Sequence, residues 1–331
     1  MALELWKARR HALATMKITP VTDYEAGISA IDSGYVRPMF DAVHLIVESG
    51  RAALIDTGTS HSLPRVLDAL TRKGLAPNDV DWVMLTHVHL DHAGGAGAMM
   101  QAFPNAKLAV HPRGGRHKAD PARLVEGTIA VYGENATKKL YGDILPIDKA
   151  RIVEMPQGAT ARLADRQFLF LDTPGHARHH LCIVDSRTGH IFTGDTFGLS
   201  YRELDDADRQ YVFPSTTPVQ FDPQALHQSI DLIASHKPGA VYVTHYGQLG
   251  DVPRLAQDMH RLVDAHAHLA LKLRDAGAQR PRLLHEGVKQ IVLDEAQRQG
   301  WKLSTPELMN VLGADVELNA QGLEAWLQSG K

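Results

Sequence analysis

The segment from Thr86 to His92 places the strongest constraint on the fold, because it holds three histidines and an aspartate in the spacing HxHxDH. It follows a continuous apolar run, residues 82–85, which is too short for a lone helix and predicts a buried strand. If that strand continues into the motif, His87 and His89 share one face, because side chains two residues apart point the same way. Asp91 and His92 then lie in the turn that follows.

Imidazole nitrogens and carboxylate oxygens are ligands that zinc, iron and manganese accept. Two histidines on one side of the motif and an aspartate–histidine pair on the other predict two adjacent metal ions. A histidine-rich strand end without metal is the simpler alternative, since single histidines usually have structural roles. Four ligand-type side chains within six residues favour the metal site.

Four further motifs also stand at the ends of β-like apolar runs. They are Asp56-Thr57-Gly58, Thr173-Pro174-Gly175-His176, Thr193-Gly194-Asp195 and Thr244-His245. Together with HxHxDH, these motifs and their order resemble the metallo-β-lactamase superfamily. The resemblance implies an α/β fold, the αββα metallo-β-lactamase sandwich, here followed by a C-terminal helical appendage.

The resemblance also implies which side chains hold the metals. The ligands fall into two sets that share one carboxylate: His87, His89 and His176 for one ion, Asp91, His92 and His245 for the other, and Asp195 for both. Asp91 and Asp195 are then the catalytic carboxylates, and Asp56 and His180 support the ligands from beneath. We expect two divalent metal ions. Zinc suits every ligand, and relatives with the same set hold iron or manganese.

The chain is expected to contain three parts. Residues 1–15 form an N-terminal segment of uncertain order, residues 16–250 the hydrolase domain with an insertion at about 112–150, and residues 251–331 a helical C-terminal cap. The β-like runs at residues 43–47 and 52–55, joined by a short turn, predict a hairpin. Helical spacing predicts a helix over residues 62–74, short helices are expected between residues 113 and 148, and Asp222-Pro223 is expected to cap a further helix. Apolar spacing also predicts long helices over residues 255–273 and 283–296. A third helix is expected to begin with Thr305 as its N-cap, followed by a short last helix around residues 323–327.

Candidates for substrate binding lie in the insertion, after Asp195 and in the C-terminal helices. The insertion carries Arg113, Arg116, His117 and Lys118, which could meet a carboxylate or phosphate; a solvated basic turn is the interpretation we favour. Tyr201 follows the bridging aspartate at a distance of six residues. In the C-terminal part the candidates are His266, His268 and His285, each of which is more often a surface or core histidine.

Composition narrows the remaining choices. The 331 residues carry a net charge of −3, which gives no general attraction to nucleic acid or to an anionic membrane. Cys182 is the single cysteine, so no internal disulfide forms. No apolar run of about 18 residues predicts a membrane span. We therefore expect a cytoplasmic protein with a small-molecule substrate and no nucleic-acid or membrane partner, and leave a homodimer open.

The implied activity is that of a hydrolase in which a metal-bridging hydroxide attacks a small ester, thioester or lactone. A di-iron protein that binds oxygen or carries out redox chemistry, and a phosphodiesterase, are alternatives on the same fold. The flavodiiron branch usually has a glutamate where this chain has His89, which weighs against the redox alternative. A regulatory protein that keeps its metals is a further option. A carboxylate at Asp195, with no cysteine ligand, argues against β-lactamase activity.

Overall fold

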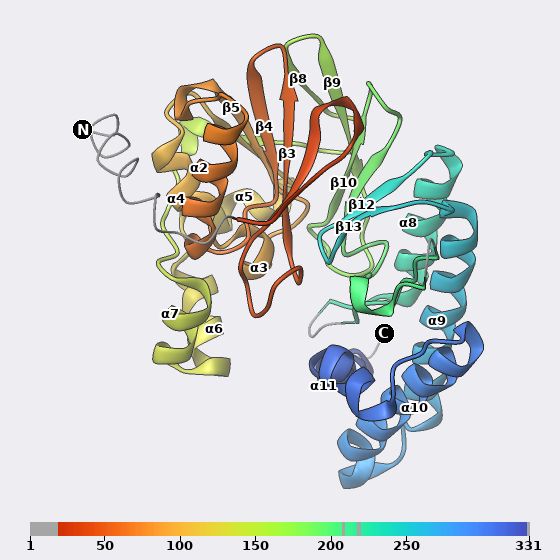
Figure 1. Ribbon diagram of the computed structural model, residues 1–331. Coiled ribbons are helices and arrows are strands. Elements are labelled where there is room, and N and C mark those ends of the chain that lie inside the picture. Colours follow the sequence, from red (N-terminus) through yellow and green to blue (C-terminus); the bar gives the residue numbers. More distant parts are fainter. Residues whose placement is uncertain (1–18, 207–208, 217–219, 330–331) are drawn as a thin grey trace. The chain divides into compact units, whose positions relative to one another are not determined.

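The computed structural model describes residues 19–206, 209–216 and 220–329. The predicted N-terminal segment 1–15 lies outside this described part. The chain divides into two compact units, separated in the sequence between Phe168 and Leu169; both contain strands and helices (Figure 1). The boundary expected near residue 250, where the hydrolase domain would end, stays a prediction.

The first unit contains a seven-stranded sheet whose spatial order follows the sequence, from β1 to β7. Its strands are β1 (Val21–Asp23), β2 (Ile28–Asp32), β3 (Ala42–Glu48), β4 (Arg51–Ile55), β5 (Val80–Met84), β6 (Lys107–Val110) and β7 (Ile152–Glu154). Strands β1 to β4 pair antiparallel, and β4 to β7 pair in parallel. The predicted hairpin is β3 and β4: Ser49 and Gly50 connect them, both with positive φ, as a tight two-residue turn requires.

The helices of this unit connect the parallel strands, which cannot be joined by a tight turn. They are α2 (Leu63–Arg72), α3 (Leu90–Ala93), α4 (Ala96–Ala102), α5 (Pro112–Ala119), α6 (Ala122–Tyr132) and α7 (Glu134–Tyr141). Helix α2 confirms the helix predicted between residues 62 and 74, and buries Val66, Ala69 and Leu70 in the core beneath the sheet. Helices α5, α6 and α7 occupy the stretch in which short helices were expected.

A second sheet has six strands in the order β13-β12-β11-β10-β9-β8. They are β8 (Thr160–Leu163), β9 (Arg166–Asp172), which contains the boundary between the units, β10 (Leu181–Asp185), β11 (Ile191–Gly194), β12 (Val241–Val243) and β13 (Gly247–Leu249). Strands β11 and β12 pair in parallel, joined through helix α8 (Pro223–Ser235). The carboxylate of Asp222 caps α8 by accepting the amide of Ala225 at 3.1 Å, as the Asp-Pro sequence predicts.

Three long helices end the chain: α9 (Val252–Lys272), α10 (Arg280–Gln299) and α11 (Thr305–Gln328). The first two confirm the predicted long helices. Two details of the third prediction are wrong. Ser304, not Thr305, is the N-cap, because its extended backbone lets its amide donate to the Glu307 carboxylate at 2.8 Å. Helix α11 also continues without a break to Gln328, since residues such as Asn319 and Leu323 are buried and packing outweighs the weak helix propensity nearby.

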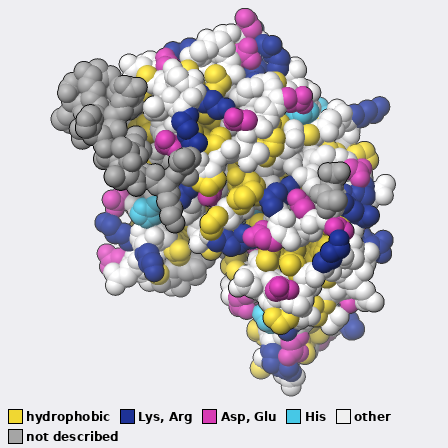
Figure 2. Space-filling view, in the orientation of Figure 1, with side chains coloured by type: hydrophobic (Ala, Val, Ile, Leu, Met, Phe, Trp, Pro, Cys, Tyr) yellow, Lys and Arg dark blue, Asp and Glu magenta, His cyan; other side chains and the backbone are white. Residues whose placement is uncertain are grey.

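Within the described residues, no helix combines the length and the apolar character that crossing a membrane would require. On the face drawn in Figure 2, basic and acidic side chains are interspersed rather than gathered by sign. This mixture agrees with the small net charge of the chain.

Candidate metal centre

Strand β5 ends before the HxHxDH motif, so the expectation that His87 and His89 lie within a strand is wrong. The last amide to follow the parallel ladder is that of Leu85, which donates to the carbonyl of Ala109 at 2.9 Å. The next amide, of Thr86, donates instead to the Asp56 carboxylate at 2.8 Å. Because this carboxylate replaces a strand partner, the chain leaves the sheet at Thr86.

Asp56 stands at the end of β4 in the left-handed region, with φ of 58°, a conformation that aspartate tolerates better than most residues. Its amide donates to the carbonyl of Met84 at 2.8 Å. Its buried carboxylate accepts the amide and hydroxyl of Thr86 and Nδ1–H of His92, the last at 2.8 Å. One side chain thus ends β5 and orients a predicted ligand.

The same hydrogen bonds decide which nitrogen of each ring is free to bind a metal. A carboxylate only accepts, so Nδ1 of His92 carries the proton and Nε2, 3.6 Å from Oδ2 of Asp91, keeps its lone pair. The Thr86 hydroxyl donates to Asp56 and accepts from Nδ1 of His87 at 3.1 Å. Nε2 of His87 is therefore also a lone-pair nitrogen.

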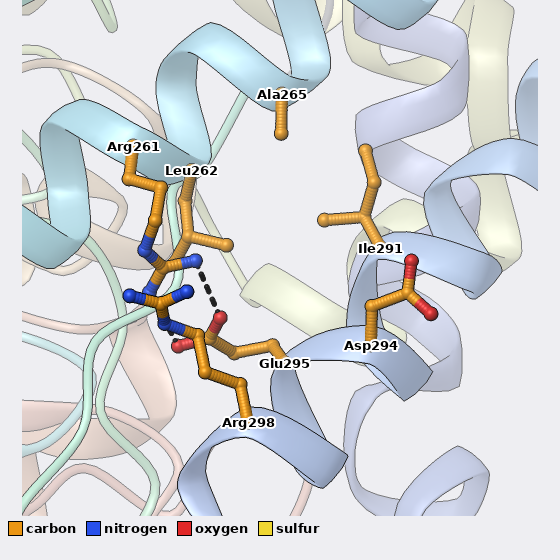
Figure 3. A pocket seen from close by; sticks show the side chains of 7 residues that line it. All are labelled: Arg261, Leu262, Ala265, Ile291, Asp294, Glu295 and Arg298. Atoms are coloured by element: carbon orange, nitrogen blue, oxygen red, sulfur yellow. Dashed lines mark hydrogen bonds and ion pairs between the residues drawn. The ribbon is translucent and has the colours of Figure 1, made fainter.

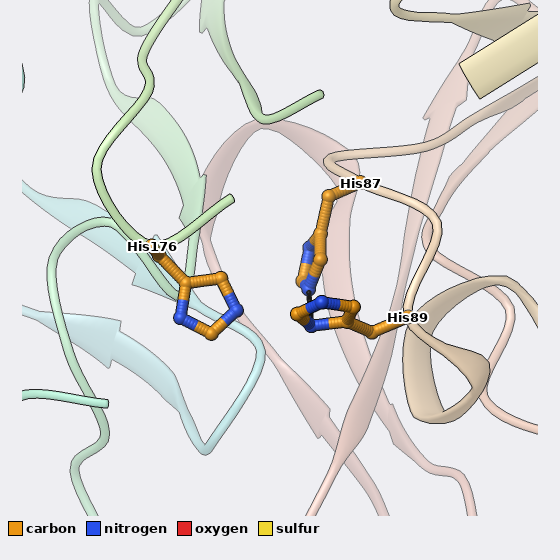
Figure 4. A group of neighbouring side chains, drawn as sticks. All are labelled: His87, His89 and His176. Atoms are coloured by element: carbon orange, nitrogen blue, oxygen red, sulfur yellow. Dashed lines mark hydrogen bonds between the residues drawn. The ribbon is translucent and has the colours of Figure 1, made fainter. Parts of the chain in front are cut away.

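The first two histidines of the motif lie against each other (Figure 4), with Nε2 of His87 2.9 Å from Nδ1 of His89. Two nitrogens bound to one tetrahedral zinc ion are about 3.3 Å apart when the bonds are 2.0–2.1 Å long, so these two nitrogens need to separate by only about 0.4 Å to bind a single ion. Asp91 and His92 lie on helix α3, a single helical turn, rather than in the open turn expected from the sequence.

In the second unit, Asp195 stands between two of the predicted histidine ligands. Its Oδ2 lies 3.6 Å from Nε2 of His176, and its Oδ1 lies 3.8 Å from Nε2 of His245. All three side chains are buried. Each carboxylate oxygen therefore faces a different histidine, which is the geometry a carboxylate needs to bind two ions, one through each oxygen.

Neighbouring groups orient the second cluster, which consists of His176, Asp195 and His245. Nδ1–H of His176 donates to the carbonyl of Ser215 at 3.2 Å, which leaves the lone pair on Nε2, the nitrogen that faces Asp195. Nε2 of His180 accepts the amide of Asp195 at 3.2 Å, so His180 positions that aspartate. Gly175 has φ of 134°, and a Cβ there would lie 2.4 Å from Cα of Leu226. The loop that carries His176, also drawn in Figure 4, therefore requires glycine.

The basic residues of the insertion do not behave alike. Arg113 is exposed, and His117 is partly exposed with a pKa lowered by burial and by its neighbours Arg116 and Lys118. Lys118, by contrast, is buried, and its Nζ donates to the carbonyl of Ala93 at 2.8 Å. Burial lowers the pKa of Lys118 to about 7. A solvated basic turn is therefore the wrong interpretation for Lys118, which holds the end of helix α3.

The substrate-binding candidates of the second unit lie in different surroundings. Tyr201 is buried, and its hydroxyl donates to Oδ1 of Asp315 on α11 at 3.2 Å. His285 is partly exposed on α10, with Nε2 3.6 Å from Oε2 of Glu317. His266 is fully buried and His268 exposed, both on α9. None of these contacts assigns a substrate-binding role, so the four remain predictions.

A cavity of about 230 Å³ lies between α9 and α10 (Figure 3). Arg261 and the buried Glu295 face each other across it in two hydrogen bonds of 2.6 and 2.8 Å. The bond to Glu295 raises the pKa of the Arg261 guanidinium. No predicted ligand lines this cavity, and two of its charged residues, Arg261 and Glu295, pair with each other. We therefore interpret it as a structural contact between the helices.

The roles of two residues beside the HxHxDH motif were missed from the sequence. The Thr86 hydroxyl bonds both Asp56 and His87, and so links the orientation of the His87 ring to Asp56. Its position directly before the motif was the sequence feature that could have indicated this role. Lys118 was noticed only as part of a basic group, because nothing in its local pattern distinguishes a buried lysine from an exposed one.

Comparison with known proteins connects these clusters to a family. The sequence model described as "Metallo-beta-lactamase superfamily" matches residues 37–245, more than half of the chain. The metallo-beta-lactamase fold-containing protein ST1585 of Sulfurisphaera tokodaii is 27% identical over 232 residues, 67% of this chain and 78% of its own. A hydroxyacylglutathione hydrolase of Xanthomonas axonopodis pv. citri is 28% identical over 189 residues, 56% of this chain. That match spans about half of the hydrolase, 55% of its length.

Solved structures agree on the fold. The crystal structure of ST1585 has a TM-score of 0.62 at 21% identity, and covers 90% of this chain and 98% of its own. The metallo-beta-lactamase family protein TTHA1429 of Thermus thermophilus has a TM-score of 0.63 at 20% identity, covering 92% and 94%. At these identities the likeness establishes the mixed α/β fold with two sheets, and no more.

Proposed function

Because this chain belongs to the metallo-beta-lactamase superfamily, we propose that it is a metal-dependent hydrolase that cleaves a small ester-type substrate, with a thioester as the leading candidate. The thioester is supported by the similarity to a hydroxyacylglutathione hydrolase, since an acyl group on glutathione is a thioester. The small-molecule substrate and the ester-type bond are parts of the same proposal.

The proposal rests on the geometry of Asp195, whose two oxygens face two different histidines. We propose that this carboxylate bridges two ions. The ligands would divide as the motifs indicate: His87, His89 and His176 on one ion, and Asp91, His92 and His245 on the other. Within each unit, the spacings of 2.9 to 3.8 Å between ligand atoms suit side chains that share an ion with bonds near 2.0–2.2 Å.

The donor set fits a divalent transition metal. It contains only imidazole nitrogen and carboxylate oxygen, and the single cysteine of the chain, Cys182, has a pKa raised by burial to about 12. A thiol in that state is a poor ligand. Zinc is the ion we propose; iron and manganese accept the same donors.

Bound at these residues, two divalent ions would acidify a water molecule and polarise a carbonyl oxygen. The protein's own groups prepare the site for that chemistry. Asp56, acting on His92 directly and on His87 through Thr86, keeps a lone pair on each ligand nitrogen. The Asp91 carboxylate, partly exposed beside Nε2 of His92, would orient the attacking water and carry a proton to the leaving group.

The first experiment is metal analysis by mass spectrometry combined with assays on a thioester, a lactone, an aryl ester and a phosphodiester. We expect about two equivalents of metal and the fastest turnover on the thioester. Asp195→Asn should lower turnover by more than about 100-fold, because even partners outside the ligand set typically cost 10- to 100-fold. Asp165→Asn, an exposed carboxylate in the turn between β8 and β9, is the matched control and should leave turnover unchanged.

Asp91→Asn separates the two roles of that residue. The amide keeps an oxygen for the metal but accepts no proton, so kcat should fall while much of the metal is retained. Two equivalents of iron, an oxygen-sensitive absorption band and no hydrolysis would replace the hydrolase with the redox alternative. Fewer than one equivalent of any metal would overturn both.

A further inference from the structure

Helices α8 and α9 carry a histidine–aspartate cluster that the proposed hydrolase centre does not use. His227 and Asp231 stand four residues apart on α8, and His260 and Asp264 stand four residues apart on α9. Residues at this spacing share one helix face. The two helices place these faces together, so that each histidine bonds the aspartate of the other helix: His227 to Asp264 at 3.0 Å and His260 to Asp231 at 3.1 Å.

These bonds fix the proton of each ring. Nε2 is the atom that meets the carboxylate in both histidines, and a carboxylate only accepts, so Nε2 carries the hydrogen. In a neutral imidazole the other nitrogen, Nδ1, is then an acceptor with an in-plane lone pair. Both Nδ1 atoms are therefore lone-pair nitrogens.

The two lone pairs point at each other. Nδ1 of His227 lies 2.6 Å from Nδ1 of His260. The ring planes are within 17° of parallel, and the ring centroids are 4.9 Å apart. The centroid distance exceeds the distance between the two nitrogens by 2.3 Å, and this excess is about the width of one ring. The nitrogens thus lie close to the line between the centroids. Two acceptors held this way repel each other unless a positive charge lies between them.

Local charge favours a divalent cation over a proton. When both rings are neutral, Asp231 and Asp264 give the cluster two negative charges. Among the described residues, these two carboxylates form ion pairs with the two histidines. A divalent ion balances both charges, whereas a shared proton balances one. An imidazole that donates its second nitrogen to a carboxylate is also the arrangement by which proteins orient metal-binding histidines.

We propose that His227 and His260 bind a divalent first-row transition-metal ion that links α8 to α9, with Asp264 and Asp231 as the orienting carboxylates. Imidazole ligands select zinc, nickel or copper over magnesium and calcium. Tetrahedral binding requires the nitrogens to separate from 2.6 to about 3.3 Å, and both rings to turn so that their lone pairs converge on the ion instead of on each other. The rings can make this movement, since their side chains are 27% and 29% exposed, and water can complete the coordination.

The test is a zinc titration of the untagged protein after its resident metal content has been measured. Wild type should bind one equivalent of added Zn²⁺ beyond that content, and zinc should raise its Tm. His227→Gln and His260→Gln should each lose the added equivalent while keeping the resident metal. His268→Gln, an exposed histidine on the same helix α9, is the matched control and should bind zinc as wild type does.

A second variant guards against an effect on folding. Asp264→Asn keeps the size of the side chain but weakens the orientation of His227, and should weaken zinc binding by about 10- to 100-fold with an unchanged Tm in the absence of zinc. The proposal is overturned if wild type binds no added zinc, as a pair that shares only a proton would, or if the added equivalent persists in both histidine variants. Because the readout is stoichiometry beyond the resident metal, this outcome is independent of whether the chain hydrolyses any ester.

Discussion

The fully buried His266 on α9 makes the stability of the second unit depend on pH. Its Nδ1–H donates to the carbonyl of Leu262 at 2.7 Å, and its ring meets Phe213 edge to face at 5.3 Å. Burial lowers the pKa of His266 to about 4, from about 6.5 in an unfolded chain. The fold therefore holds this imidazole neutral at pH values where the unfolded chain protonates it.

The sign and size of the effect follow from linkage. A depressed pKa contributes stability that is complete above pH 6.5 and is lost as the pH falls towards 4. Each pKa unit corresponds to about 1.4 kcal/mol, so a fall from pH 7.5 to 5 should cost wild type about 2 kcal/mol through His266. His266→Asn stays neutral and can keep a donor for the Leu262 carbonyl. Its lost packing adds a destabilisation that does not change with pH.

The assay is denaturant unfolding of wild type and His266→Asn at a series of pH values from 5 to 7.5. The difference in unfolding free energy between wild type and the variant should shrink by about 2 kcal/mol as the pH falls, because only wild type carries an imidazole that must stay neutral in the fold. Other groups, including the buried His44, whose pKa burial lowers to about 4, titrate alike in both proteins and cancel. His268→Asn should run parallel to wild type. Parallel curves for His266→Asn would refute the reasoning.

Three further predictions concern residues beside the HxHxDH motif and the loop that carries His176. Asp56→Asn should weaken metal binding by about 10- to 100-fold, measured by competition with a chelator, since it orients His92; undiminished affinity would contradict this. Gly175→Ala should lower both the Tm and the metal content, because a Cβ at φ of 134° meets the α8 backbone; an unchanged Tm would count against that loop geometry. Wild type should gain stability between pH 7 and 9, where the unfolded chain still protonates Lys118 and the fold does not, and Lys118→Met should flatten this gain in unfolding experiments. Equal slopes would show that Lys118 is hydrated.

The position of the ligand motifs at strand ends could be predicted because each follows an apolar run, whereas their assignment to two ions came from the resemblance to a known family. The hairpin of β3 and β4 and the helix α2 were predictable for the same reason, since their hydrophobic spacing is local. What the sequence could not show is where β5 stops. Its apolar run continues to Leu85, and the strand ends there because a carboxylate 30 residues earlier, that of Asp56, takes the next amide.

Contacts between distant residues account for the other differences. The buried Lys118 donates a hydrogen bond to the carbonyl of Ala93, which lies 25 residues earlier in the chain. The four residues of the α8–α9 cluster are ordinary polar positions on two amphipathic helices, and His227 and His260 are 33 residues apart. Periodicity assigns such residues to a solvated face. Only the packing of one helix on another turns two such faces into a candidate site.

The geometry of Asp195 also bears on how many ions the hydrolase centre would hold. A single ion bound through Oδ2 and His176 would leave Oδ1 and the buried His245 facing each other 3.8 Å apart with no cation. Burying a carboxylate oxygen away from a cation is costly, whereas a second ion held by Oδ1 and His245 would make the same arrangement favourable. Two ions should therefore bind with similar affinity rather than in widely separated steps, and a chelator titration should release them together. Stable retention of one equivalent would indicate that His245 belongs to a different function.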